Sequence, residues 1–388
     1  MKKSITTTLI FLSTLFNVKA FAYPSTLHYS VATGKEPLAL DSIDLWDSEA
    51  SSDFVTYQLP LEWEGQWWRA NQSFDLSVGS ISSKHFLSYK RIKVRKFLTE
   101  KLELNLQYLE ARDFEQDRSS LPLELIYWFK PKWGLSAFGT PSLYKSEDDI
   151  GLALHFRPTK DFTIRFSNLW GDFQLNERNI QPDRWTMPAY SQTLSATYLP
   201  EDSQKFLNAE LHYEPQSTRV NTAAGTRTDL SYRALLLTAN WGRLLYDEAD
   251  QSLNGEVSKR QRFLNQFEKS FWLGAHRVRP GLNIFYRQTR RGLQQTIDRE
   301  VLPTVWVDGP QRPMAWGVRT VSAGLDSTIF SREVDGGISD SWQNRLNIKL
   351  DMRFIKSGQL ALLFTADLDQ LGSGESWEGG AGQFRIDF

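Results

Sequence analysis

The sequence has no cysteine, no strong net charge, and no apolar run after residue 22 long enough for a membrane-spanning helix. A spanning helix needs about 20 consecutive apolar residues. Without cysteine, the fold cannot be held by disulfides, and paired-cysteine metal sites are excluded. With 45 basic and 46 acidic side chains, the chain lacks the basic surface of a nucleic-acid-binding protein. A fold without disulfides must be held in another way, and a closed hydrogen-bonded sheet is one.

The first 22 residues have the three parts of a secretory signal peptide. Two lysines precede an apolar stretch, and Ala20 and Ala22 flank Phe21 in the small-x-small pattern of a cleavage site. A first transmembrane helix is the alternative, but the apolar stretch is shorter than the required length of about 20 residues. We therefore predict a signal peptide over residues 1–22 and a mature chain that begins at Tyr23.

Alternation of apolar and polar side chains recurs along the mature chain, between clusters of turn-forming residues. It is clearest over residues 345–354 and is repeated over 207–213 and 162–166. A period of two predicts β-strands, and a strand crosses a bilayer in about 9 to 11 residues. Aromatic residues make up 13% of the chain, which suits the aromatic girdles of a membrane barrel. The pattern predicts an all-β, antiparallel transmembrane β-barrel of about 16 strands, within a range of about 14 to 18.

The carboxyl terminus supports the same fold class. Phe384, Ile386 and Phe388 alternate with polar residues, and Phe388 is the last residue. This ending resembles the final strand of Gram-negative outer-membrane β-barrel proteins, a porin-like class in which the terminal aromatic residue is the signal for barrel assembly. The resemblance implies a multi-pass barrel in the outer membrane, surrounded by outer-membrane lipid, with the barrel-assembly machinery as a partner. No motif assigns a particular family.

Connector lengths alternate as expected for such a barrel, with tight periplasmic turns and longer outer loops. With both termini in the periplasm, the predicted periplasmic connectors are short: 99–101, 131–132, 158–160, 200–204, 309–313 and 356–358. The predicted outer connectors are longer: 113–120, 172–189, 216–229, 292–299, 331–340 and 370–378.

Two segments within and before the predicted barrel, which spans residues 72–388, do not fit this scheme. Residues 23–71 form an N-terminal extension, which we interpret as a periplasmic segment, a plug or an extra strand. Residues 242–270 form a long insert on the periplasmic side, where Asn254 is placed to cap a helix that reaches Phe271. This helix is interpreted as lying on the rim, constricting the pore or binding a periplasmic partner, and the insert is an outer loop if the alternation of sides fails here.

Catalytic motifs are missing from the sequence: it has no nucleophile elbow, zinc-binding His-Glu pair or phosphate-binding glycine loop. His28 and Ser30 have a spacing that resembles outer-membrane phospholipases and lipid A deacylases, but the rest of that pattern is missing, so a lipid hydrolase is a distant third reading. Asp367, Asp369 and Glu375 are interpreted as a solvated acidic loop because their spacing does not suit calcium. We predict no enzyme activity, catalytic residue, metal site or cofactor.

If the apolar face of each strand contacts lipid, many basic side chains turn toward the lumen. The candidates for charge selectivity are Arg95, Arg157, Arg165, Arg287, Arg291, Arg345, Lys349 and Arg353. The same rule turns carboxylates inward: Glu103, Glu124, Glu210, Asp351, Asp367 and Asp387. The arginines either form a basic wall that attracts anions or pair with the carboxylates and rigidify the barrel.

The leading functional prediction is an outer-membrane channel. It would pass small hydrophilic or anionic solutes, or export an anionic polymer such as a polysaccharide. The alternative is a non-conducting structural or assembly barrel that works with the envelope machinery.

Overall fold

The computed structural model describes residues 73–81, 87–112, 117–120, 123–140, 149–170, 183–187, 190–198, 200, 207–239, 241–310, 317–355, 358–373 and 376–387. The predicted signal peptide with Ala20 and Ala22, the N-terminal extension with His28 and Ser30, and Phe388 lie outside these ranges. Phe384 and Ile386 lie in the last strand. Among the described residues, no helix is long and apolar enough to cross a membrane.

The described residues form 21 strands. Their bounds are β1 Ser73–Ile81, β2 Leu87–Phe97, β3 Leu102–Arg112, β4 Asp117–Ser120, β5 Leu123–Lys130, β6 Trp133–Thr140, β7 Asp149–Thr159, β8 Phe162–Trp170, β9 Asp183–Met187, β10 Tyr190–Tyr198 and β11 Leu207–Asn221. The remaining strands are β12 Thr226–Ala239, β13 Gly242–Leu253, β14 Glu256–Glu268, β15 Phe271–Leu273, β16 His276–Arg291, β17 Gln294–Asp308, β18 Val318–Val334, β19 Gly337–Ile355, β20 Gly358–Asp367 and β21 Trp377–Asp387.

The antiparallel pairings lead around the molecule and return to the first strand. β1 pairs with β2 on one side and with β21 on the other, from Ser73 opposite Asp387 to Ile81 opposite Gly379. The short strands β4, β9 and β15 attach to β3, β11 and β16, so 21 − 3 = 18 strands make up the circuit. The all-β antiparallel class is therefore confirmed, and the 18 strands of the described circuit fall at the upper limit of the predicted range of about 14 to 18.

The predicted helical insert is wrong, because residues 242–270 contain the hairpin of β13 and β14. Asn254 does not cap a helix. It forms the hairpin turn with Gly255, and their φ values are 52° and 90°. Asn-Gly between two strands is the typical two-residue turn with positive φ. A hairpin adds two strands at once. The connectors before and after it therefore lie at the same ends of the barrel as predicted.

Gly255 gives a direct test of this turn. Its φ is +90°, and a Cβ built there meets no atom within 4 Å, so Gly255→Ala changes only the backbone energy. We expect a loss of roughly 1 kcal/mol in unfolding free energy because L-residues disfavour positive φ. Urea unfolding of the refolded barrel measures it, with Asn254→Gly as a control that should change little. An equal effect of both substitutions contradicts the assigned turn.

Most large apolar side chains are on the outside of the barrel, and many polar ones are on the inside. Leu211 and Leu325 are 54% and 55% exposed, whereas Arg157 and Arg345 are each 2% exposed. Buried apolar clusters also occur among the described residues, and the largest of them consists of Leu236, Leu245, Phe285 and Leu302. An apolar exterior around an uninterrupted hydrogen-bonded wall is what a bilayer requires of a β-structure.

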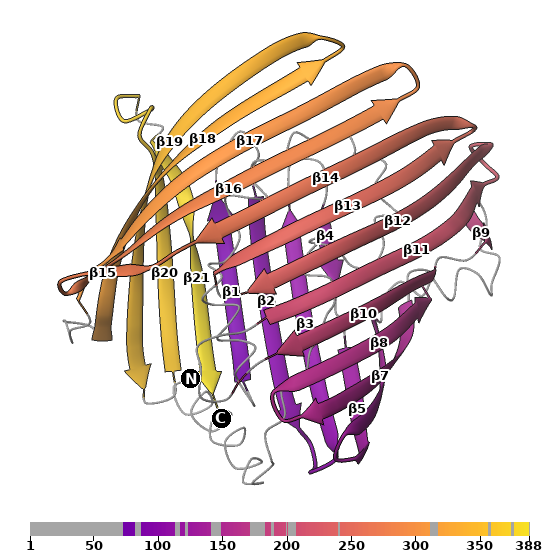
Figure 1. Cartoon of the computed structure of the whole chain (residues 1–388), viewed down its shortest axis with the longest axis horizontal. Helices are drawn as coiled ribbons and strands as arrows, with labels where there is room; N and C mark the ends of the chain where they lie inside the picture. Colours follow the sequence, from indigo (N-terminus) through magenta and orange to yellow (C-terminus); the bar gives the residue numbers. More distant parts are fainter. Residues whose placement is uncertain are drawn as a thin grey trace, which may run out of the picture.

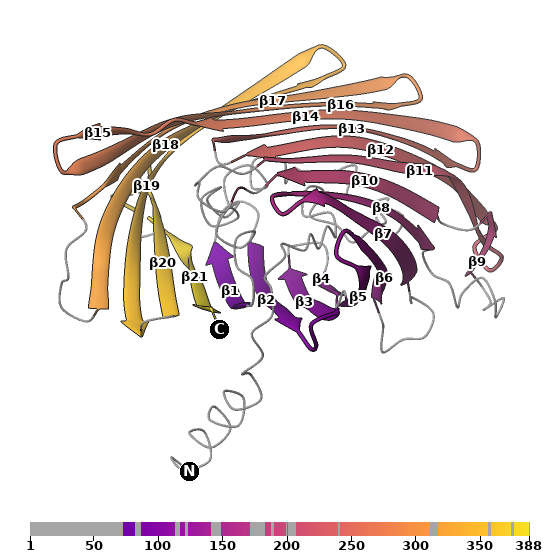
Figure 2. The same ribbon diagram turned by 60° about the horizontal axis from the view of Figure 1, so that its bottom comes forward.

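The strands differ greatly in length around the barrel. β19 has 19 residues and β18 has 17, whereas β5 and β6 have 8 each. Figure 1 shows the hairpins of β11–β12, β13–β14, β16–β17 and β18–β19 extending beyond the other strands at one end of the barrel, here called the hairpin end. In Figure 2 these long strands form one broad side, and β1 to β7 lie opposite. The opposite end, where β1 begins and β21 ends, has short turns such as the one joining Lys130 to Trp133.

Candidate functional site

The candidate site is the inner wall of the barrel, where buried charges of both signs occur together. Among the described residues, nine carboxylates are buried: Glu103, Glu124, Glu210, Glu214, Asp247, Asp298, Glu300, Asp326 and Asp367. Seven cationic side chains are buried: Arg157, Arg165, Arg260, Arg279, Arg287, Arg345 and Lys349. Among the buried side chains of the described wall, carboxylates therefore outnumber cationic groups.

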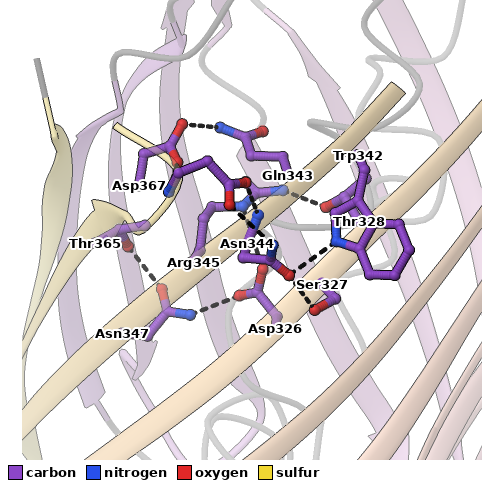
Figure 3. Close-up of polar contacts among 11 residues, drawn as sticks. Asp326, Ser327, Thr328, Trp342, Gln343, Asn344, Arg345, Asn347, Thr365 and Asp367 are labelled. Carbon is purple, nitrogen blue, oxygen red and sulfur yellow. Dashed lines mark hydrogen bonds and ion pairs between the residues drawn. The ribbon is translucent and has the colours of Figure 1, made fainter. Parts of the chain in front are cut away.

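One polar network crosses β18, β19 and β20 (Figure 3). Arg345 Nε lies 3.2 Å from Asp326 Oδ1, and Asn347 donates a 2.6 Å hydrogen bond to Asp326 Oδ2. Thr365 donates in turn to Asn347 Oδ1 at 2.8 Å. Each side chain is aligned with the next because alternate residues of paired strands share one face. The network fixes the Arg345 guanidinium on the wall and balances its charge.

A second network lies across β13, β14, β16, β17 and β18. Asp247 contacts Arg260 at 3.6 Å and accepts a 2.7 Å hydrogen bond from Arg262 Nε. Asp298 accepts from Arg287 Nε at 2.7 Å through Oδ2 and from Arg332 Nε at 2.8 Å through Oδ1. Each of these two carboxylates therefore joins two guanidiniums, and the four arginines are held by charge-assisted hydrogen bonds and ion pairs.

Arg279 forms a third site nearer the opposite end of the barrel. Its Nε and Nη2 each donate a 2.9 Å hydrogen bond to Asp308, one to each carboxylate oxygen. Its Nη1 also donates to Glu268 at 3.2 Å. This two-point geometry fixes the orientation of the guanidinium as well as its charge.

A fourth cluster, on β5 to β8, contains a serine, a histidine and a glutamate. Ser136 Oγ lies 2.9 Å from His155 Nε2 and donates to Glu124 Oε1 at 2.7 Å. Glu124 also lies 3.4 Å from the same His155 Nε2 and 3.4 Å from Arg165 Nη2. In a catalytic triad the carboxylate binds the other ring nitrogen, Nδ1. The cluster thus differs from a hydrolytic triad and connects the strands of the wall instead.

The structure places the predicted selectivity residues unevenly. Arg157, Arg165, Arg287, Arg345 and Lys349 are buried on the inner wall. The Cζ of Arg157 stacks 3.4 Å from the centroid of the Trp128 ring. Arg291 and Arg353 are exposed. Arg95 is paired in register with the buried Asn105, and its side chain lies outside the described set.

The predicted solvated acidic loop is wrong for Asp367, which is the last residue of β20, while Asp369 follows the strand and Glu375 lies outside the described residues. Asp367 is buried on the inner wall, where its Oδ2 accepts from Gln343 at 2.9 Å. Asp369 accepts hydrogen bonds from Asn344, at 2.9 Å from the side-chain amide and 2.7 Å from the backbone. These bonds stabilise the carboxylate and lower the pKa of Asp369. The described acidic and histidine residues contain no group of three that could hold a metal ion.

Sequence reasoning missed four important residues of the wall. Asp247, Arg260 and Arg262 lie in the segment interpreted as an insert, and Asp298 lies in a segment predicted to be an outer loop. The Asn-Gly turn at Asn254 was the available signal, because it predicts a hairpin whose strands carry these residues inward.

No protein-family model and no curated protein matches the sequence. Similar solved structures include a bacterial polysaccharide outer membrane secretin, with 7% identity, a TM-score of 0.40, and coverage of 82% of this chain and 98% of that chain. OccAB3 of Acinetobacter baumannii has 8% identity, a TM-score of 0.39, and coverage of 82% and 97%. A loop-deletion mutant of OmpT, an outer membrane protein of Vibrio cholerae, has 10% identity, a TM-score of 0.34, and coverage of 82% and 98%. Likenesses of this size identify neither a substrate nor a partner for this chain.

Proposed function

We propose that this chain is an outer-membrane channel that passes small hydrophilic solutes by diffusion. The observation that carries the proposal is the polar, charged inner wall of a circuit of 18 strands. Barrels of about 16 to 18 strands are too wide for wall side chains to fill, so they enclose water. An apolar exterior sets such a barrel in lipid, and its polar interior then provides a path for solutes.

The charge balance of the wall argues for weak ion selectivity. Arg345 is paired with Asp326, and Arg287 and Arg332 share Asp298. A paired charge attracts mobile ions less than an isolated one because its field is cancelled over a short distance. We therefore favour small hydrophilic solutes of either sign over a strictly anionic substrate, and export of an anionic polymer has no specific support from the described wall.

Conductance of the refolded protein in planar bilayers tests this function. We expect steady conductance with a reversal potential near zero in a salt gradient. Arg345→Gln should shift permeability toward cations and Asp326→Asn toward anions, each by about twofold, because each substitution exposes the charge of the other residue. Lys259→Gln is the control, since Lys259 lies on the outer face of β14 with its side chain 63% exposed. A folded barrel without conductance would reject the channel and favour the structural or assembly role.

A further inference from the structure

The hairpin end of β19 has a strand edge that no described residue covers. β19 pairs with β18 along its upper part, from Gly337 opposite Val334. On its other side, the pairing with β20 begins only at Arg345 opposite Asp367. Residues 337–342, here called the β19 edge, are therefore paired on one side only within the described ranges.

The direction of the backbone groups on the β19 edge follows from Asn344. Its N–H donates to Asp369 Oδ2, and its C=O accepts from the N–H of Leu368 at 2.8 Å. Both groups therefore point away from β18. Antiparallel strands alternate bonded and non-bonded pairs, so the N–H and C=O groups of Ile338, Asp340 and Trp342 point the same way. They are ready to pair with another strand.

Elsewhere in the barrel, a short strand covers the place where a long strand extends past its neighbour. β4 pairs with β3 at Leu109 to Arg112, and β9 pairs with the far end of β11. β15 pairs with the start of β16. An uncovered edge can pair with any extended chain, and proteins usually protect edges for that reason. Within the described residues, the β19 edge is left without the cover that β3, β11 and β16 have.

The β19 edge has exposed apolar side chains and lacks the residues that usually protect a strand edge. Ile338 and Trp342 are 66% and 64% exposed, and they share one face because they lie four residues apart. Asp340 lies between them on that face, and it has no ion-pair partner among the described residues. The segment contains no lysine, arginine or proline, the residues that commonly protect an edge.

We propose that the β19 edge binds an extended segment of a partner polypeptide, which adds as a strand beside β19. The bound strand would place apolar residues beside Ile338 and Trp342 and a basic residue beside Asp340, at alternate positions. Backbone hydrogen bonds would supply affinity, and these three side chains would supply specificity. This inference is independent of conductance, because the edge lies in the part of β19 that extends past β20.

Binding of a synthetic peptide tests the proposal. The probe is a labelled nine-residue peptide with valine, lysine and valine at alternate positions and threonine elsewhere. Fluorescence anisotropy measures its binding to the full chain refolded in lipid vesicles. Asp340→Pro should weaken binding by about tenfold or more, because it removes an N–H directed at the partner without breaking a bond to β18. Equal binding to both proteins overturns the proposal.

Charge reversal gives a second test that does not depend on proline. Asp340→Lys should weaken binding of the lysine peptide and strengthen binding of a peptide with glutamate in its place. Asp250→Lys is the matched control, since Asp250 is an exposed carboxylate on β13, and it should change neither. A lack of reversal at Asp340 contradicts the assigned pairing. Concentration-dependent self-association that Asp340→Pro abolishes would show instead that a second copy of this chain occupies the edge.

Hydrogen exchange detected by NMR on the same samples locates the bound strand. In the free protein, the amides of Ile338 and Trp342 should exchange faster than those of Ser339 and Ser341, which face β18. Saturation with the lysine peptide should slow the first pair at least tenfold and leave the second pair nearly unchanged. Uniform exchange across the segment, or slowing elsewhere on the barrel, overturns the proposed site.

Discussion

Asp298→Ala should lower the unfolding free energy of the barrel by about 3 to 5 kcal/mol, the usual cost of removing one partner from a buried ion pair. Asp298 is 1% exposed and holds Arg287 through one carboxylate oxygen and Arg332 through the other. Its loss leaves two guanidiniums close together without their shared counter-charge. Urea unfolding in lipid vesicles, followed by the loss of β-sheet circular dichroism, measures the change.

Asp250→Ala is the matched control for this prediction. Asp250 also faces a cation across neighbouring strands, but its oxygen is 3.9 Å from Lys259 Nζ and both side chains are more than half exposed. Exposed pairs contribute at most about 1 kcal/mol. A double variant, Asp298→Ala with Arg332→Ala, should recover part of the lost stability because one uncompensated charge is removed. Equal effects of Asp298→Ala and Asp250→Ala would show that the inner-wall pairs are not structural.

Ile348→Arg should destabilise the membrane-inserted barrel by about 2 to 4 kcal/mol, the cost of a charge facing the middle of the bilayer. Ile348 lies on the outer face of β19, is 40% exposed, and has Leu346 and Leu350 two residues away on the same face. The arginine would meet lipid tails there instead of water. The fraction folded into vesicles across a urea series gives the difference.

Ile338→Arg, on the same strand and the same face, is the control. Ile338 is 66% exposed, and it lies about 33 Å further along β19 at about 3.3 Å per residue. That distance places it beyond an apolar band about 25 Å tall, so we expect a change within about 0.5 kcal/mol. A penalty at residue 338 as large as that at residue 348 contradicts our assignment of the upper part of β19 to water.

The strands that the sequence predicted best have one face in lipid. Residues 345–354 alternate because Leu346, Ile348 and Leu350 face outward while the buried Arg345, Asn347 and Lys349 face inward. A single apolar face produces the period-two pattern that sequence reading detects. The predicted turn at residues 131–132 is confirmed as well. The alternating pattern of β5 ends just before it, and that of β6 begins just after it.

The hairpin end was predicted less well. Residues 292–299 and 331–340 were read as loops, but they are mostly strand, with tight turns at Gly292 and at Asp335 and Gly336. Beyond the bilayer both faces of a strand meet water, so the sequence need not alternate there. In the sequence these turns are marked by Gly292 and Gly336, both of which the structure places at positive φ.

The sequence by itself determined the class of this protein, because lipid outside and water inside impose a period-two alternation on the spanning strands, and the signal peptide and the terminal aromatic strand place that alternation in an outer-membrane barrel. The charges facing the lumen were also largely evident, since alternation assigns Arg157, Arg165, Arg287, Arg345 and Lys349 to one face. Only the tertiary structure shows which of those charges are paired with one another. Pairing depends on the register between strands distant in sequence, which brought Asp326 to Arg345 and Asp298 to both Arg287 and Arg332. Register also left the β19 edge without a paired strand among the described residues, because strand length and the point where β20 stops are set by neighbouring strands rather than by local residue pattern.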